Sequence, residues 1–215
     1  MSEEDQRRPD ELPLGRLDAF SDGVFAIAIT LLVLELGVQA TAATDLAGAI
    51  VGLWPAYLAY ITSFLTIGVM WLRHTTITSM LRAGDSVLFR INLVVLLVAA
   101  FLPFPTKLVG EFIGEREPEQ VAVLFYGIVL LLLDLSMVAF ARYAVEERRL
   151  VKPDVTDERL REVTAPISLA FYGVAMLIGF LLPTIGVLLY LAIAVYVGIP
   201  GKTIHRLMRT AGLRR

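Results

Sequence analysis

Long runs of apolar residues alternate with short polar segments along the chain. Six of the runs approach the length of about 20 residues that a helix needs to cross the hydrocarbon of a bilayer. They cover residues 17–38, 47–72, 88–109, 120–142, 165–182 and 184–200. Only the Pro/Gly turn signal "PTIG" at residues 183–186 separates the last two, so a single long hairpin would give the same pattern. The pattern predicts an all-α membrane protein with six transmembrane helices per subunit.

Prolines and glycines refine these predicted helices. Pro55, within "WPAY", should lie close to the outer end of the second helix or kink it. The prolines of "LPFP" at residues 102–105 should bend or end the outer part of the third. Gly127, Gly173 and Gly179 are expected to permit close approach between helices, because small residues serve this purpose in membranes.

Composition supports the membrane prediction and excludes several kinds of site. Of 215 residues, 57% are hydrophobic and 19% are charged, whereas soluble domains average about 45–50% and about 25%. The chain has no cysteine, which excludes disulfides, zinc–thiolate sites and cysteine nucleophiles. It also lacks HExxH, GxSxG and a phosphate-binding glycine loop. We therefore expect a multi-pass protein of the cell membrane that is not an enzyme and needs no cofactor.

The basic residues predict the orientation of the chain. Of the 19 Lys and Arg residues, all but Lys107 and Arg116 lie on the side that holds both termini. An excess of positive charge marks the cytoplasmic side, so both termini are expected in the cytoplasm. We divide the chain into a disordered tail (1–15), a six-helix transmembrane domain (16–202) and a basic cytoplasmic tail (203–215). The longest connection, residues 143–164, is expected to be a solvated charged linker or a helix extension.

The first predicted helix carries a regular apolar stripe. At 100° per residue, one side of the helix collects Arg16, Phe20, Gly23, Ile27, Thr30, Leu31 and Leu34. Spacing alone favours a lipid-facing or helix-packing role for such a stripe. Asp22 lies about 100° away from Gly23, so the acid and the apolar stripe face different neighbours.

Asp22 requires a partner, because a carboxylate within a membrane helix costs about 2.5–3.5 kcal/mol on insertion scales. Polar residues of other helices lie at the same predicted depth near the cytoplasmic side. They are Trp71, Arg73 and His74 on the second helix, Arg90 and Asn92 on the third, and Asp134 on the fourth. We interpret them as a hydrogen-bond and ion-pair network that joins the helices. A proton-sensing or gating role for His74, or a catalytic one, is the alternative.

Arg16, Phe20, Ser21 and Asp22 spell RxxxFSD at the start of the first apolar helix. With "WLRH" at residues 71–74 and "RINLVVLLVAAFLPFPTKLVGEF" at residues 90–112, this motif resembles the signature of the transmembrane protein 175 family of lysosomal potassium channels and bacterial homologues. The resemblance covers most of the first three helices. Only one copy of the motif occurs, which is similar to the bacterial branch of single-repeat homotetramers.

The resemblance implies that the first helix of each subunit lines a central pore. It places Ile27 at the narrowest constriction and Leu31 and Leu34 at further apolar rings, with a potassium ion transiently near the hydroxyl of Thr30. The TVGYG filter of other potassium channels is absent from the sequence. The resemblance also implies a structural network near the inner side, formed by Arg16, Phe20, Ser21, Asp22, Trp71, His74 and Asn92.

Glu35, near the outer end of the first helix, is a candidate for the extracellular vestibule, with a snorkelling or capped carboxylate as the alternative. The functional hypothesis is a leak-type potassium-selective channel whose partners are potassium ions, membrane lipid and further copies of the chain, without nucleic acid. A proton-permeable channel or a proton-coupled transporter that uses Asp22 and His74, with Asp134 as a further relay group, is the alternative. A non-conducting membrane scaffold also remains open.

Overall fold

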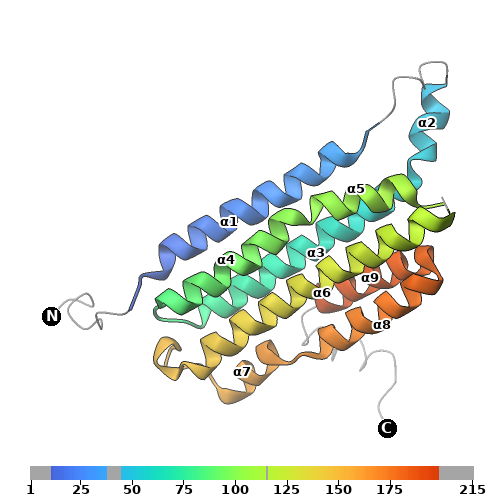
Figure 1. Cartoon of the computed structure of the whole chain (residues 1–215). Coiled ribbons are helices and arrows are strands. Elements are labelled where there is room, and N and C mark those ends of the chain that lie inside the picture. The colour runs from blue at the N-terminus through green and yellow to red at the C-terminus, as the bar shows by residue number, and fades with distance from the viewer. Residues whose placement is uncertain (1–10, 38–44, 115, 199–215) are drawn as a thin grey trace, which may run out of the picture.

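The apolar runs fold into long helices that pack side by side with their axes roughly aligned (Figure 1). The computed structural model describes residues 11–37, 45–114 and 116–198. Its helices are α1 (Leu14–Leu31), α2 (Leu46–Gly52), α3 (Trp54–Ser79), α4 (Ser86–Phe101), α5 (Pro103–Phe112), α6 (Arg116–Glu146), α7 (Asp157–Thr164), α8 (Ile167–Leu181) and α9 (Pro183–Gly198). Two 3₁₀ turns, Leu32–Glu35 and Arg148–Leu150, follow α1 and α6. The prediction of an all-α protein is confirmed over the described residues.

Five helical stretches are long and apolar enough to cross a membrane. They are Leu14–Glu35, Trp54–Ser79, Ser86–Phe112, Glu117–Glu146 and Asp157–Leu181. The sixth apolar run forms α9, which is shorter than these stretches. α8 ends at Leu181 and α9 begins at Pro183, so the predicted turn at "PTIG" breaks the helix, and the two helices pack against each other.

Proline positions the breaks within the second and third runs. The second run divides into α2 and α3, and Pro55 occupies the first turn of α3, where its missing N–H has no helical partner to lose. The third run breaks between Phe101 and Pro103. Both breaks were predicted. The second helix, expected to end at residue 72, instead continues to Ser79.

That extension is polar, and its hydroxyl groups explain how it stays helical. Thr75 and Thr76 donate to the carbonyl oxygens of Trp71 and Leu72 at 3.0 and 2.7 Å. Ser79 donates to the carbonyl of Thr76 at 2.7 Å. Because these side chains bond within their own helix, hydropathy alone underestimates its length.

α6 forms the centre of the bundle. In its membrane-spanning window 61% of the residues are buried, compared with 22–39% in the other four spans. α6 packs against α4, α5 and α8, while α3 packs against α5 and α9. α1 contacts α3 and α4 and lies along one edge of the bundle, with α8 along the opposite edge (Figure 1). The first helix is therefore covered on one side only.

The linker at residues 143–164 is folded: the expected helix extension is present at its start, while the alternative of a solvated segment is corrected. α6 extends to Glu146, and the backbone of Val151 then pairs with that of Leu81 in an antiparallel bridge. Leu150 and Leu160 are buried. The apolar residues of this charged segment dock it against the α3–α4 turn. The high proportion of charged residues in the segment is the reason that this contact was not predicted.

The end of the predicted N-terminal tail is also ordered from Glu11. Leu12 forms an antiparallel bridge with Gly84, and the carboxylate of Glu11 pairs with Arg82. Residues 1–10 of the predicted tail, residues 199–202 of the transmembrane domain and the basic tail (203–215) lie outside the described residues.

Close approach between α8 and α9 depends on two glycines. A Cβ atom built on Gly186 would lie 2.4 Å from the Cα atom of Gly179, which is closer than real Cβ contacts allow. Gly179 therefore serves the predicted purpose. A Cβ on Gly127 would collide with the Tyr190 hydroxyl at 2.1 Å, whereas one on Gly173 would meet nothing within 4 Å.

Replacing Gly186 by alanine is expected to lower the stability of the protein by about 1–3 kcal/mol, because the new methyl group forces two backbones apart. The loss would be measured as a lower thermal unfolding midpoint of the purified protein in detergent. Gly173→Ala is the matched control on α8 and should leave the midpoint unchanged or slightly raised, since alanine favours helix and meets open space. Equal effects of the two variants would contradict the close contact.

Candidate functional site

The two sides of α1 differ sharply in burial. Leu17, Ser21, Phe25 and Ala28 face the bundle and are buried. Every member of the predicted stripe, hereafter the α1 stripe (Arg16, Phe20, Gly23, Ile27, Thr30, Leu31 and Leu34), is exposed. Ile27 is 60% exposed and Leu34 is 72% exposed. The described part of the chain thus leaves an apolar helix face uncovered, so in a membrane lipid, another protein surface or water must meet it.

Thr30 places an oxygen atom on this face. Its hydroxyl donates to the carbonyl oxygen of Ile27 at 2.9 Å. The hydrogen is therefore directed back along the helix, and the lone pairs of the hydroxyl oxygen are left for another partner. An oxygen in this state can accept a hydrogen bond or contact a cation.

Behind the stripe, a chain of hydrogen bonds joins α1, α3 and α4. Nε2 of His74 lies 2.8 Å from Oδ1 of Asn92, and Nδ2 of Asn92 donates to Oγ of Ser21 at 2.9 Å. Since an amide oxygen only accepts, Nε2 of His74 carries the hydrogen in this arrangement. All three side chains are at most 2% exposed.

Aromatic contacts and a second hydrogen bond complete this network. The His74 ring stacks on Phe140 with centroids 5.1 Å apart, and Phe25 of α1 meets it edge-on at 5.7 Å. Nε1 of Trp71 donates to a carboxylate oxygen of Asp22 at 2.8 Å. The predicted hydrogen-bond partner of the Asp22 carboxylate is therefore present, and it lies on α3.

A separate ion pair joins α3, α6 and α8. Arg73 pairs through Nη1 with Oδ1 of Asp134, and Ser168 donates to Oδ2 of the same carboxylate at 2.7 Å. Asp134 is fully buried. Both of its oxygens are engaged, which satisfies a charge that could not otherwise remain in the core.

The single predicted network is therefore two networks, and three of its expected members lie outside both. Arg16, Phe20 and Arg90 are exposed and make no hydrogen bond, ion pair or ring contact with the described residues. For Arg16 and Phe20 the reason is geometric, because both belong to the α1 stripe and face away from Ser21. These two residues therefore take no part in the network within the described part of the chain, and their predicted structural role stays a prediction.

Glu35 lies on the 3₁₀ turn after α1, beside α5. Its carboxylate is 3.9 Å from Nζ of Lys107, which is also 4.0 Å from Glu111. The charge of Glu35 is thus partly balanced by one of the two basic residues on the predicted outer side. Its place in a vestibule stays a prediction.

Sequence reasoning missed the hydroxyl groups that complete the buried polar sites. Ser63 bonds with the Thr106 hydroxyl at 2.7 Å and with the Tyr126 hydroxyl at 2.8 Å, which joins α3, α5 and α6 at a distance from the His74 network. Ser168 likewise completes the Asp134 site. Isolated Ser and Thr residues within apolar runs were the available signal, but their spacing does not identify a partner.

Asn92→Ala is expected to destabilise the protein by about 1–3 kcal/mol, since it leaves the buried Nε2–H of His74 without its acceptor and the buried hydroxyl oxygen of Ser21 without its donor. The thermal unfolding midpoint in detergent would measure the loss. Val94→Ala, on the exposed side of the same helix, is the control and should change the midpoint little. If Asn92→Ala lowered the unfolding midpoint no more than the control does, the network would not contribute to the stability of α1 in the bundle.

Comparison with known proteins places this geometry among ion channels. Residues 16–103 match the family model described as endosomal/lysosomal potassium channel TMEM175. This range includes the α1 stripe and the hydrogen-bonded side chains of Ser21, His74 and Asn92. A potassium channel of Streptomyces collinus is 37% identical over 166 residues, which cover 77% of this chain and 81% of that protein. One of Chamaesiphon minutus is 42% identical over 125 residues, covering 57% and 62%.

The fold comparison agrees with the sequence comparison. The crystal structure of a lysosomal potassium-selective channel TMEM175 homologue from Chamaesiphon minutus superposes with a TM-score of 0.75 at 34% identity, over 85% of this chain and 95% of that one. The human endosomal/lysosomal proton channel TMEM175 is 26% identical over 175 residues, which cover 77% of this chain but only 35% of that protein.

Proposed function

This chain belongs to the TMEM175 family, and we propose that it is a potassium-selective, leak-type channel of the cell membrane. The observation that carries the proposal is the exposure of the α1 stripe on the helix that begins with the RxxxFSD motif. Relatives named potassium channels support the choice of ion.

Several copies of the chain, four in the simplest arrangement, would surround a shared axis with α1 innermost. A closed ring uses a head-to-tail interface that repeats around the axis. Each stripe residue then becomes a ring of identical side chains. Ile27, Leu31 and Leu34 supply apolar rings, and Thr30 supplies a ring of hydroxyl oxygens.

An apolar ring conducts only when it is wide enough to stay wet, so Ile27 is both the proposed constriction and the proposed gate. Potassium sheds its water more readily than sodium. An ion that must lose part of its hydration shell at Ile27 would therefore pass more easily as potassium, and the Thr30 hydroxyls would replace some of the lost water.

The rest of the chain serves as a scaffold in this proposal. α9 is taken as the sixth crossing, and the Lys and Arg bias places both termini in the cytoplasm. The transmembrane channel domain spans residues 16–202, between a cytoplasmic N-terminal tail and a basic C-terminal tail at 203–215.

A proton-permeable channel or proton-coupled transporter is the second candidate. Asp22 is an exposed carboxylate beside the stripe, and its partner Trp71 lies three residues before the buried His74 on α3. The proton channel name of the human relative favours keeping this candidate. It differs from the first in the ion that carries the current.

Flux from proteoliposomes separates these functions. Vesicles loaded with potassium would be diluted into potassium-free buffer, with internal pH and potassium followed together. A channel predicts passive potassium efflux that follows the membrane potential and falls when sodium replaces potassium. Flux that saturates and requires a proton gradient would indicate a transporter, and no flux above empty vesicles would indicate a scaffold.

A further inference from the structure

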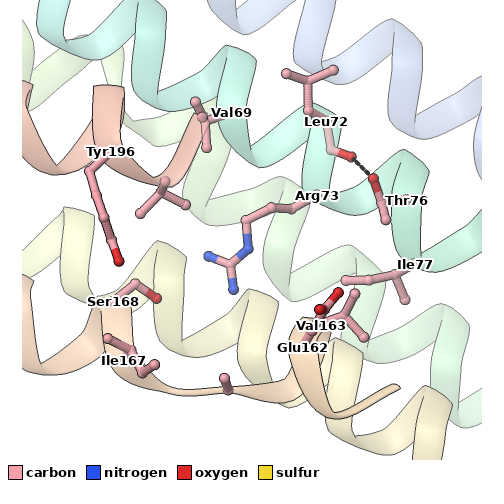
Figure 2. Close-up of a pocket in the computed structure, with 13 residues that line it drawn as sticks. Val69, Leu72, Arg73, Thr76, Ile77, Glu162, Val163, Ile167, Ser168 and Tyr196 are labelled. Carbon is pink, nitrogen blue, oxygen red and sulfur yellow. Dashed lines mark hydrogen bonds between the residues drawn. The ribbon is translucent and has the colours of Figure 1, made fainter. Parts of the chain in front are cut away.

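A pocket of about 530 Å³ opens between α3, α7, α8 and α9, away from the α1 stripe (Figure 2). Its walls are mainly apolar and include Val69, Ile77, Ile167 and Val197. Five polar side chains also line it, namely Arg73, Thr76, Glu162, Ser168 and Tyr196. A largely apolar cavity with a few converging polar groups is the usual form of a small-molecule site.

Arg73 directs unused hydrogen-bond donors into this pocket. Its contacts with the described residues all use Nη1, which meets Asp134 and, at 3.9 Å, the sulfur of Met70. Figure 2 shows the guanidinium extending between Tyr196, Ser168 and the residues of α7. A guanidinium has five N–H donors in a planar fork, so Nε and Nη2 are available to an acceptor in the pocket.

The charge of the pocket limits what that acceptor can be. The charge of Arg73 is already balanced by Asp134, while Glu162 is exposed at the rim and has no ion-pair partner among the described residues. A purely anionic ligand would bring its charge to a site whose described residues carry no surplus of positive charge. A ligand with both an anionic and a cationic group suits the free donors of Arg73 and the carboxylate of Glu162 together.

The pocket lies where the chain changes from polar to apolar. α7 has the sequence "DERLREVT" and α8 the sequence "ISLAFYGVAMLIGFL". The segment between them, at Ala165, lines the pocket. Such a transition marks the surface of the bilayer, and Tyr196 beside it is half-exposed, as tyrosines of membrane interfaces often are. The polar groups of the pocket are thus at the level of lipid headgroups.

We propose that this pocket binds a phospholipid with a phosphoethanolamine headgroup. The phosphate accepts hydrogen bonds from Nε and Nη2 of Arg73, the primary ammonium group pairs with Glu162, and an acyl chain lies along the apolar wall near Ile167. A choline headgroup fits less well, because its quaternary ammonium cannot donate a hydrogen bond to the carboxylate. The proposal does not depend on which ion the channel conducts.

The test is thermal unfolding of the purified full-length protein in detergent with added lipid. Phosphatidylethanolamine should raise the unfolding midpoint more than phosphatidylcholine or phosphatidylglycerol, and soluble phosphoethanolamine should not raise it. Glu162→Gln should lower the apparent affinity for phosphatidylethanolamine several-fold and remove its advantage over phosphatidylcholine. Glu158→Gln, exposed on α7 outside the pocket, is the matched control and should keep both.

A pocket-filling variant tests the location independently. Thr76→Phe places a ring in the pocket and should abolish stabilisation by the lipid. Thr75, the preceding residue of α3, is exposed and lies outside the pocket, so Thr75→Phe should not abolish it. Equal midpoint shifts from all three lipids, a preference for phosphatidylglycerol, or full stabilisation of Thr76→Phe would overturn the proposal. If Thr76→Phe does not fold, the comparison of Glu162→Gln with Glu158→Gln still decides.

Discussion

Ile27→Asn is expected to raise the potassium conductance several-fold and to weaken the preference for potassium over sodium. Ile27 is 60% exposed on the α1 stripe, and in a ring of subunits it forms the proposed apolar constriction. An amide side chain of similar size offers hydrogen-bonding groups to water, so the constriction would stay wet and ions would pass without losing as much of their hydration shell. Single-channel recording in planar bilayers, with potassium on one side and sodium on the other, measures both quantities.

Leu177→Asn is the matched control for this experiment. Leu177 is 68% exposed on α8, which lies at the edge of the bundle opposite α1 (Figure 1). Both changes place an amide on an apolar helix face that is exposed in the single chain. The control should conduct as the unchanged protein does. An unaltered conductance and permeability ratio in Ile27→Asn would remove Ile27 from the conduction pathway.

Asp134→Ala is expected to destabilise the protein by about 3–5 kcal/mol, because it leaves the guanidinium of Arg73 without its counter-ion in the bundle. The change also removes the acceptor of the Ser168 hydroxyl. The loss would be measured as the shift of the unfolding midpoint when the protein in mild detergent is titrated with a denaturing one.

The double variant Arg73→Leu with Asp134→Leu distinguishes loss of the pair from creation of an unpaired charge. Replacing both partners of a buried ion pair by apolar side chains is often close to neutral, so the double variant should be more stable than Asp134→Ala alone. If the double variant lost as much stability as Asp134→Ala, the interaction between Arg73 and Asp134 would itself stabilise the packing of α3 against α6. The cost of leaving one charge unpaired would then not explain the loss.

The sequence predicted the ends of helices well where proline or hydropathy determines them. It predicted them less well where hydrogen bonds and contacts of individual side chains do. The breaks at Pro55 and Pro103 follow from the missing N–H of proline, and the structure has both. The polar continuation of α3 to Ser79 was missed, because its hydroxyls bond to their own helix. The docking of residues 143–164 was also missed, since Leu150 and Leu160 are isolated apolar residues in a charged segment.

The polar networks show a similar division. Depth along the helices correctly predicted that Asp22, Trp71, His74 and Asn92 lie at one level, because helix rise converts residue number into depth. Depth does not give the direction in which each side chain points. The sequence therefore could not separate Asp134 and Arg73 from the His74 network.

The proposed oligomeric pore is tested most directly with a single cysteine, since the chain contains none of its own. In Ile27→Cys, a cationic thiol reagent should block potassium flux from proteoliposomes, and an oxidant should link neighbouring subunits into covalent dimers. Leu177→Cys should keep its full flux in the presence of the reagent and form no such dimers. Labelled Ile27→Cys protein that conducts like unlabelled protein and stays monomeric under oxidant would show that lipid, and not a pore, covers the α1 stripe.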